Sequence, residues 1–131
     1  MNSFLLTFLY FLAAIAVVLV GLVIFELLTR KYKDWEEINA NNTAVALSIA
    51  GKIIGTCVIL TFSILENDTI IETVTWGLFG LLLQFIAYFL FELLTPRFSV
   101  ETQLKERNTS VGIISFAVSV GLAFVIGASI T

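Results

Sequence analysis

Four long apolar stretches, separated by short polar segments, dominate the pattern of hydrophobic and polar positions along this chain. Each stretch is close to the roughly 20 residues that an α-helix needs to cross about 30 Å of hydrocarbon. They run from Phe4 to Phe25, Thr43 to Leu65, Thr73 to Phe91 and Thr109 to Ile130. The pattern therefore predicts an all-α integral membrane protein with four transmembrane helices.

The second half of the chain repeats motifs of the first half, displaced by 66 residues. FELLT occurs at Phe25–Thr29 and again at Phe91–Thr95, and NTAV at Asn42–Val45 returns as NTSV at Asn108–Val111. Because each half holds two spans, both halves enter the membrane in the same direction. We therefore expect one membrane domain of two parallel, same-orientation helical-hairpin repeats with a pseudo-two-fold axis along the membrane normal. The repeats comprise residues 1–65 and 66–131.

Composition narrows the function classes. Only 13% of the residues are charged and the mean hydropathy is +1.03, whereas a soluble surface needs roughly 25–35% charged residues. The chain has no histidine, and its one cysteine, Cys57, lies inside the second stretch. The usual metal ligand, the usual neutral-pH acid–base group and an internal disulfide are therefore all missing. We expect no cofactor, no metal site, no nucleic-acid partner and no enzymatic activity.

The basic residues predict the orientation. Six of the seven lie after the first and third stretches, and the opposite side carries acidic residues only. Positive charge in short loops marks the cytoplasmic side, so both hairpin loops are expected to be cytoplasmic and both termini extracytoplasmic. The first stretch lacks a basic leader and is longer than the roughly 7–15 apolar residues of a signal peptide. We interpret it as a retained helix. The six basic residues are Arg30, Lys31, Lys33, Arg97, Lys105 and Arg107.

Asn42 and Asn108 each stand directly before a span. An asparagine side chain there can accept a hydrogen bond from the free backbone N–H groups of the first helical turn. The alternative is that two positive helix N-termini near the pseudo-axis form a site for an anion or a lipid headgroup. We favour capping, because every buried helix start has to satisfy these N–H groups.

The second and fourth spans are rich in small residues, which allow close backbone approach between helices in lipid. Gly51 and Gly55 form a GxxxG motif, and Gly121 occupies the position equivalent to Gly55 in the repeat. We therefore expect close packing at Gly51, Gly55 and Gly121. The first and third spans should lie outside this pair and face lipid.

An intramembrane polar cluster is predicted from four residues within the spans: Glu26, Lys52, Gln84 and Glu92. A charge at the bilayer centre costs roughly 2.5–3.5 kcal/mol, so each should face protein or water. Lys52 is expected to pair with Glu26 or Glu92, and both alternatives remain open. Gln84 should lie near the depth of Lys52 and could accept a hydrogen bond from its ammonium.

Two roles are open for this cluster: a clamp that joins helices, or part of a proton or ion pathway. The polar set is only partly repeated, since Lys52 corresponds to Val118 and Gln84 to Val18. A four-helix monomer is also too thin to enclose a wet pore, so conduction would require an oligomer. Both points favour the clamp.

The segment Glu37–Gly55 (EINANNTAVALSIAGKIIG), with its echo Arg107–Gly112, resembles the bacterial membrane family catalogued as domain of unknown function 350. The resemblance covers the whole chain, and the FELLT segments and Lys52 make it most similar to the Bacillus-type branch of uncharacterised transmembrane proteins. It implies a multi-pass protein of the bacterial plasma membrane without an established substrate. It provides no catalytic residues.

The function favoured by these patterns is that of a non-enzymatic scaffold or helix-packing assembly unit that presents two cytoplasmic loops. Its expected partners are the lipid bilayer, a second copy of the chain and a cytoplasmic protein. The alternative is an oligomeric proton or cation channel or transporter that uses the polar cluster.

Overall fold

The computed structural model describes residues 2–28, 34–93 and 100–130, which form six α-helices and no strand. Four of these helices are long and apolar enough to cross a membrane. They are α1 (Ser3–Leu28), α3 (Thr43–Glu66), α4 (Ile70–Leu93) and α6 (Thr109–Ser129), and the short helices are α2 (Asp34–Asn39) and α5 (Val100–Lys105). The predicted all-helical fold with four candidate spans is confirmed.

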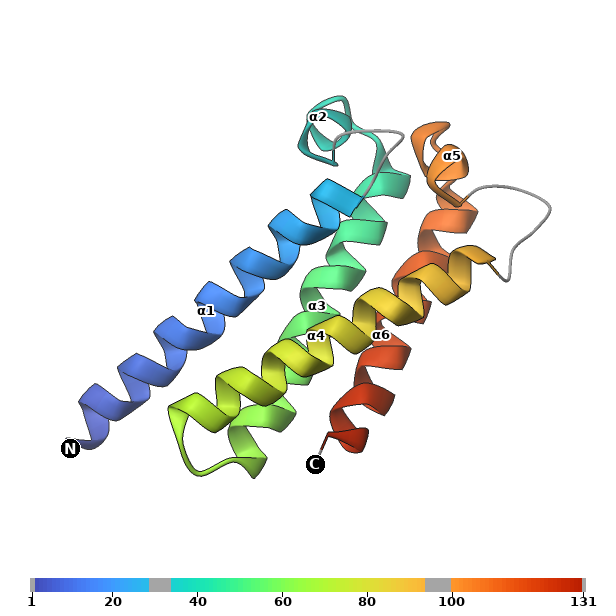
Figure 1. Ribbon diagram of the computed structural model, residues 1–131. Helices are drawn as coiled ribbons and strands as arrows, with labels where there is room; N and C mark the ends of the chain where they lie inside the picture. The colour runs from blue at the N-terminus through green and yellow to red at the C-terminus, as the bar shows by residue number, and fades with distance from the viewer. Residues whose placement is uncertain (1, 29–33, 94–99, 131) are drawn as a thin grey trace.

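The two short helices lie at one end of the molecule, and the Ser3 end of α1 and the Ser129 end of α6 lie at the other (Figure 1). Helices α3 and α6 run side by side in the same direction, and they have the most extensive contact of any helix pair in the described structure. Helix α4 crosses this pair and contacts both members.

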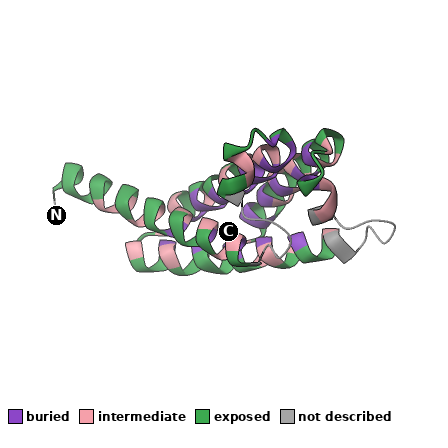
Figure 2. Ribbon diagram, turned by 90° about the horizontal axis from the view of Figure 1, so that it is seen from above, coloured by how far each residue is buried: buried purple, intermediate pink, exposed green. Residues whose placement is uncertain are grey.

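The four spans differ in burial, with α4 and α6 intermediate at 33% each. Half of the α3 span is buried, compared with 17% of the α1 span. Every described residue from Asn2 to Phe8 is exposed, and these turns of α1 extend beyond the other helices (Figure 2). Large apolar side chains on the outer faces suit a lipid surrounding, where exposure of leucine or phenylalanine carries no hydrophobic penalty.

The short helices α2 and α5 were not predicted, since the sequence indicated polar loops over residues 30–41 and 96–107. Each ends in the same motif. Asn41 and Arg107 have positive φ angles of 63° and 66°, and the next residue donates its N–H five residues back, from Asn42 to Glu37 and from Asn108 to Gln103. This Schellman arrangement satisfies carbonyl groups at a helix end. Residues 29–33 and 94–99 lie outside the described residues.

Helix α4 begins at Ile70, three residues before the predicted Thr73. The reason is a cap that the apolar pattern does not include. The hydroxyl of Thr69 accepts a hydrogen bond from the N–H of Glu72 at 3.1 Å, as in the helix-start motif Thr-x-x-Glu. The polar turn on this side of the molecule is therefore shorter than the sequence suggested.

Candidate functional site

Helices α3 and α6 meet at glycines. A Cβ added to Gly51 would lie 2.8 Å from the Cα atom of Phe116, and one added to Gly112 would lie 2.8 Å from the Cα atom of Ala44. Both contacts are with backbone, which cannot move aside as a flexible side chain can. A Cβ at Gly55 would collide with the amide nitrogen of Gln84. These positions therefore need glycine for the two backbones to approach this closely.

Gly121 differs from this pattern and corrects the prediction made for it. It is exposed, and a Cβ added there would meet no atom within 4 Å among the described residues. The repeat places Gly121 at the position of Gly55, but Gly55 is covered by Gln84 of α4. None of the described helices covers the equivalent position of α6, and the main contacts of α1 are with α3 and α4.

Asn42 and Asn108 occupy the N-cap positions of α3 and α6. Their side-chain oxygens accept hydrogen bonds from the N–H groups of Val45 and Val111, at 3.2 and 3.3 Å. The two caps differ in burial, since Asn42 is 1% exposed whereas Asn108 is half-buried. Each cap thus satisfies a backbone donor that an apolar surrounding would leave without a partner.

Hydrogen bonds also join the two polar segments. The side-chain nitrogen of Asn42 donates to the carbonyl oxygen of Leu104 at 2.9 Å. In the other direction, the guanidinium of Arg107 donates to the carbonyl oxygens of Asn41 at 3.1 Å and Ala40 at 2.8 Å. Leu104 is fully buried in a cluster with Ala44, and so α5 is anchored to α3. The ends of α2 and α5 therefore form one connected surface.

Lys52 lies at the centre of the buried polar side chains. It is 1% exposed, and its Nζ atom lies 5.0 Å from the ring centroid of Phe25 on α1 and 4.6 Å from that of Tyr88 on α4. These distances fall within the range of cation–π attraction, which is stronger for a desolvated ammonium. Lys52 thus connects α3 with both flanking helices.

The predicted counter-ions of Lys52 have different outcomes. Glu26 is half-buried and forms no ion pair within the described part of the chain. The physical reason is helical geometry: successive residues point about 100° apart, and Phe25, at 2% exposure, occupies the inward position. The side chain of Glu92 lies outside the described residues, so its pairing with Lys52 stays a prediction.

Gln84 is buried one helical turn before Tyr88, and its oxygen accepts a hydrogen bond from the hydroxyl of Thr56 at 3.2 Å. The predicted bond from the Lys52 ammonium to Gln84 is not present among the described side chains. Ser48 and Ser115 lie in the predicted contact between the two small-residue spans, and their hydroxyl oxygens lie 3.2 Å apart. The hydrogen bonding of these serines and of Thr56 was not predicted. The signal was their spacing, since Ser48, Lys52 and Thr56 recur every four residues on one face of α3.

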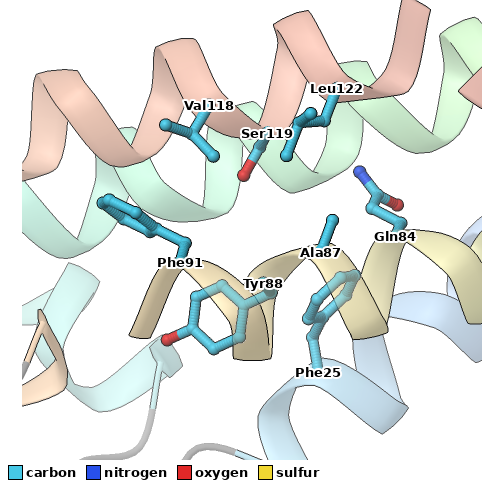
Figure 3. A pocket seen from close by; sticks show the side chains of 8 residues that line it. All are labelled: Phe25, Gln84, Ala87, Tyr88, Phe91, Val118, Ser119 and Leu122. Carbon is cyan, nitrogen blue, oxygen red and sulfur yellow. The ribbon is translucent and has the colours of Figure 1, made fainter. Parts of the chain in front are cut away.

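A small, partly enclosed space adjoins Gln84, with room of about 10 Å³ for the centre of a water molecule. Figure 3 shows Gln84 reaching from α4 toward α6, and Ser119 projecting from α6 toward α4. The other walls are apolar or aromatic. The complete lining is Phe25, Gln84, Ala87, Tyr88, Phe91, Val118, Ser119 and Leu122.

The described side chains at this junction offer hydrogen bonding and charge. Hydroxyl groups, one primary amide and one ammonium are buried together between α3, α4 and α6. Within residues 2–28, 34–93 and 100–130, no three His, Cys, Asp or Glu side chains come close enough to hold a metal ion. We therefore describe this group of side chains, Ser48, Lys52, Thr56, Gln84, Tyr88, Ser115 and Ser119, as the polar junction.

Comparison with known proteins agrees with a membrane location. The family described as Domain of Unknown Function (DUF350) matches residues 1–130. The UPF0719 transmembrane protein YshE of Bacillus subtilis is 41% identical over 121 residues, which cover 92% of this chain and 90% of that protein. The UPF0719 inner membrane protein YjfL of Escherichia coli is 27% identical over 103 residues, or 79% and 76% of the two chains. No solved structure matches the chain significantly.

Proposed function

This chain belongs to the DUF350 family, and from this membership and its loop contacts we propose that it is a non-enzymatic assembly unit of the bacterial plasma membrane. In this role the four spans hold a surface at the membrane face, to which a cytoplasmic protein binds. We call this surface the loop platform. It comprises the exposed residues Trp35, Glu36, Lys105 and Glu106 on α2 and at the end of α5.

The observation that carries the proposal is the direct hydrogen bonding between the two polar segments. Arg107 donates to two carbonyl groups at the end of α2, and Asn42 donates to the last turn of α5. Two independent loops would not need such bonds, whereas a binding surface made from both needs a defined geometry. Side chains held on a preorganised surface lose less conformational freedom on binding a partner.

An internal repeat would explain why the two segments match. The bounds Asp34–Asn39 of α2 and Val100–Lys105 of α5 differ by 66 residues at both ends, as do the starts of α3 and α6. The two residues with positive φ, Asn41 and Arg107, have the same separation. We therefore propose that residues 1–65 and 66–131 are parallel hairpin repeats of one domain, related by a pseudo-two-fold axis.

The orientation in this proposal rests on the basic residues near the loops, which place the loop platform in the cytoplasm and both termini outside. Lys105 and Arg107 lie at this end of the described structure, while Glu66, Asp68 and Glu72 are exposed at the opposite end. Among the described residues, basic side chains lie at the loop end and none lie at the opposite end, which supports the assignment.

The polar junction fits a clamp better than a pathway. Lys52 lies between two aromatic rings, and the space beside Gln84 has room for about one water molecule. A proton or cation pathway, the alternative function, needs a continuous row of water or of groups that change charge. We propose that the junction instead fixes α1, α4 and α6 against α3. It thereby holds the α2 and α5 parts of the loop platform in a constant position relative to each other.

Affinity purification of the full-length chain from bacterial membranes tests this function. We expect a cytoplasmic protein to copurify with the wild type. The amount recovered should be lower with Trp35→Ala and with Lys105→Glu. The control is Phe124→Ala, because Phe124 is exposed on the lipid-facing side of α6. Recovery of the same proteins from all variants, or of none from the wild type, would contradict the proposal.

A further inference from the structure

The primary amide of Gln84 has more hydrogen-bonding capacity than its described surroundings use. Gln84 is 3% exposed, and its side chain has one hydrogen bond to a described residue, the 3.2 Å bond from Thr56. The Nε2 atom has no hydrogen-bond partner within the described chain. A primary amide carries two donor hydrogens and an acceptor oxygen, so most of this capacity remains open.

Rotating the amide does not remove the problem. The hydroxyl of Thr56 has a single proton and already lies 2.8 Å from the carbonyl oxygen of Lys52. Gln84 could therefore donate to Thr56 instead of accepting from it, which would turn its oxygen the other way. In either orientation one polar atom of the amide points away from Thr56. In a membrane interior no bulk water is present to satisfy that atom.

The space beside this atom has the size of a hydration site, and two polar side chains border it. It offers about 10 Å³ for the centre of a water molecule, close to the roughly 10–15 Å³ that one buried water requires. Gln84 approaches it from α4 and Ser119 from α6 (Figure 3). Both side chains are at least nine-tenths buried. The remaining walls are apolar or aromatic.

We propose that this cavity binds a single water molecule, which joins the amide of Gln84 on α4 to the hydroxyl of Ser119 on α6. A buried water with two or more polar partners is part of a structure rather than a passing solvent molecule. The site is independent of the loop platform, because it lies within the membrane and requires no protein partner. It completes a polar link among α3, α4 and α6 that passes through Thr56, Gln84 and Ser119.

Nuclear magnetic resonance can detect this water, because the chain contains only two glutamines, Gln84 and Gln103. Labelling glutamine with ¹⁵N in full-length protein in lipid nanodiscs gives two side-chain amide pairs, which Gln84→Leu assigns. We expect the Gln84 amide protons to show a dipolar cross-peak with water, of opposite sign to chemical exchange in a rotating-frame experiment. Absence of that cross-peak would overturn the proposal.

Three further variants separate a bound water from hydroxyl protons that exchange with solvent. Ala87→Val and Leu122→Phe fill the cavity from opposite walls while keeping Gln84, Thr56 and Ser119, and both should abolish the cross-peak. The lipid-facing control Ile86→Val should retain it, as should Thr56→Val, which removes the hydroxyl that bonds to the Gln84 amide. A cross-peak that survives both fillings, or that disappears in Thr56→Val, would mean that a hydroxyl proton and not water produces the signal.

Discussion

The ammonium nitrogen of Lys52 lies 4.6 Å from the centroid of the Tyr88 ring, one helical turn from the Gln84 amide that bonds to Thr56. Lys52 and Thr56, one turn apart on α3, therefore contact Tyr88 and Gln84, one turn apart on α4. The ring of Phe25 on the other side of the ammonium adds α1 to the same group. A single buried cation thus contacts both helices that flank α3.

Replacing Lys52 tests this arrangement. Lys52→Met should lower the free energy of unfolding by about 1–2 kcal/mol, since a desolvated cation–π contact is worth about that much. Lys52→Glu should lower it more, because a carboxylate facing two rings has no such attraction and carries a large desolvation penalty. The measurement is reversible unfolding in mixed micelles. Equal stability of all three proteins would mean that the ammonium reaches water.

Tyr88 offers a conservative partner test. Tyr88→Phe keeps the aromatic face toward Lys52 and should stay near wild-type stability, whereas Tyr88→Leu removes the ring and should lose about 0.5–2 kcal/mol. The same unfolding assay applies. If Tyr88→Leu matched Tyr88→Phe, the ring face would make no contribution and the clamp would have to rest on other contacts.

Alanine substitution should lower stability at the glycines of the α3–α6 contact but not at Gly121. Gly51→Ala and Gly112→Ala place a Cβ 2.8 Å from backbone atoms, and forced overpacking of this kind typically costs about 1–3 kcal/mol. Gly121→Ala enters open space and should leave stability unchanged or raise it by up to about 1 kcal/mol, because alanine favours helix. Thermal unfolding in one detergent is sufficient. If Gly121→Ala lowered stability as much as Gly51→Ala, the result would indicate an interface on the outer face of α6.

Removing the two N-cap asparagines should lower stability by unequal amounts. Asn42→Ala removes the cap of α3 and the bond to Leu104, and a lost cap alone costs about 0.5–2 kcal/mol. Asn108→Ala removes a cap and a bond to Gln103 within its own segment. We therefore expect the larger loss for Asn42→Ala. Asn42→Ser, which keeps a capping oxygen, should recover part of it. Equal losses for the two alanine variants would show that the bond between the segments contributes nothing.

Flux measurements decide between clamp and pathway. Purified wild type in liposomes should pass no more protons or monovalent cations than a Glu26→Gln, Glu92→Gln double variant, since a clamp requires no charge to move. Empty liposomes provide the baseline. A potential-driven current that is present in the wild type and absent in the double variant would establish the channel alternative.

The membrane class and the four spans could be predicted because they depend on local properties: the number of consecutive apolar residues, and the side chains that can cap a helix in lipid. Asn42 and Asn108 are examples, since a cap acts within one turn of its own helix. The short helices and the start of α4 were missed although their signals are local too, in Asn41, Arg107 and the Thr69-x-x-Glu72 motif.

The polar junction required the tertiary structure. Sequence alone could identify Lys52 and Gln84 as buried polar groups, but it could not place the rings of Phe25 and Tyr88, on two other helices, beside the Lys52 ammonium. Gly55 and Gly121 are equivalent in the sequence and differ in the structure, because only Gly55 is covered by α4. Which face of a helix is covered depends on the positions of its neighbours, and these follow from the packing of all four spans together.

The sequence by itself determined that the chain forms membrane helices and where each begins and ends to within a turn. The tertiary structure decided which side chains meet, because contacts between residues far apart in the chain depend on helix crossing and rotation.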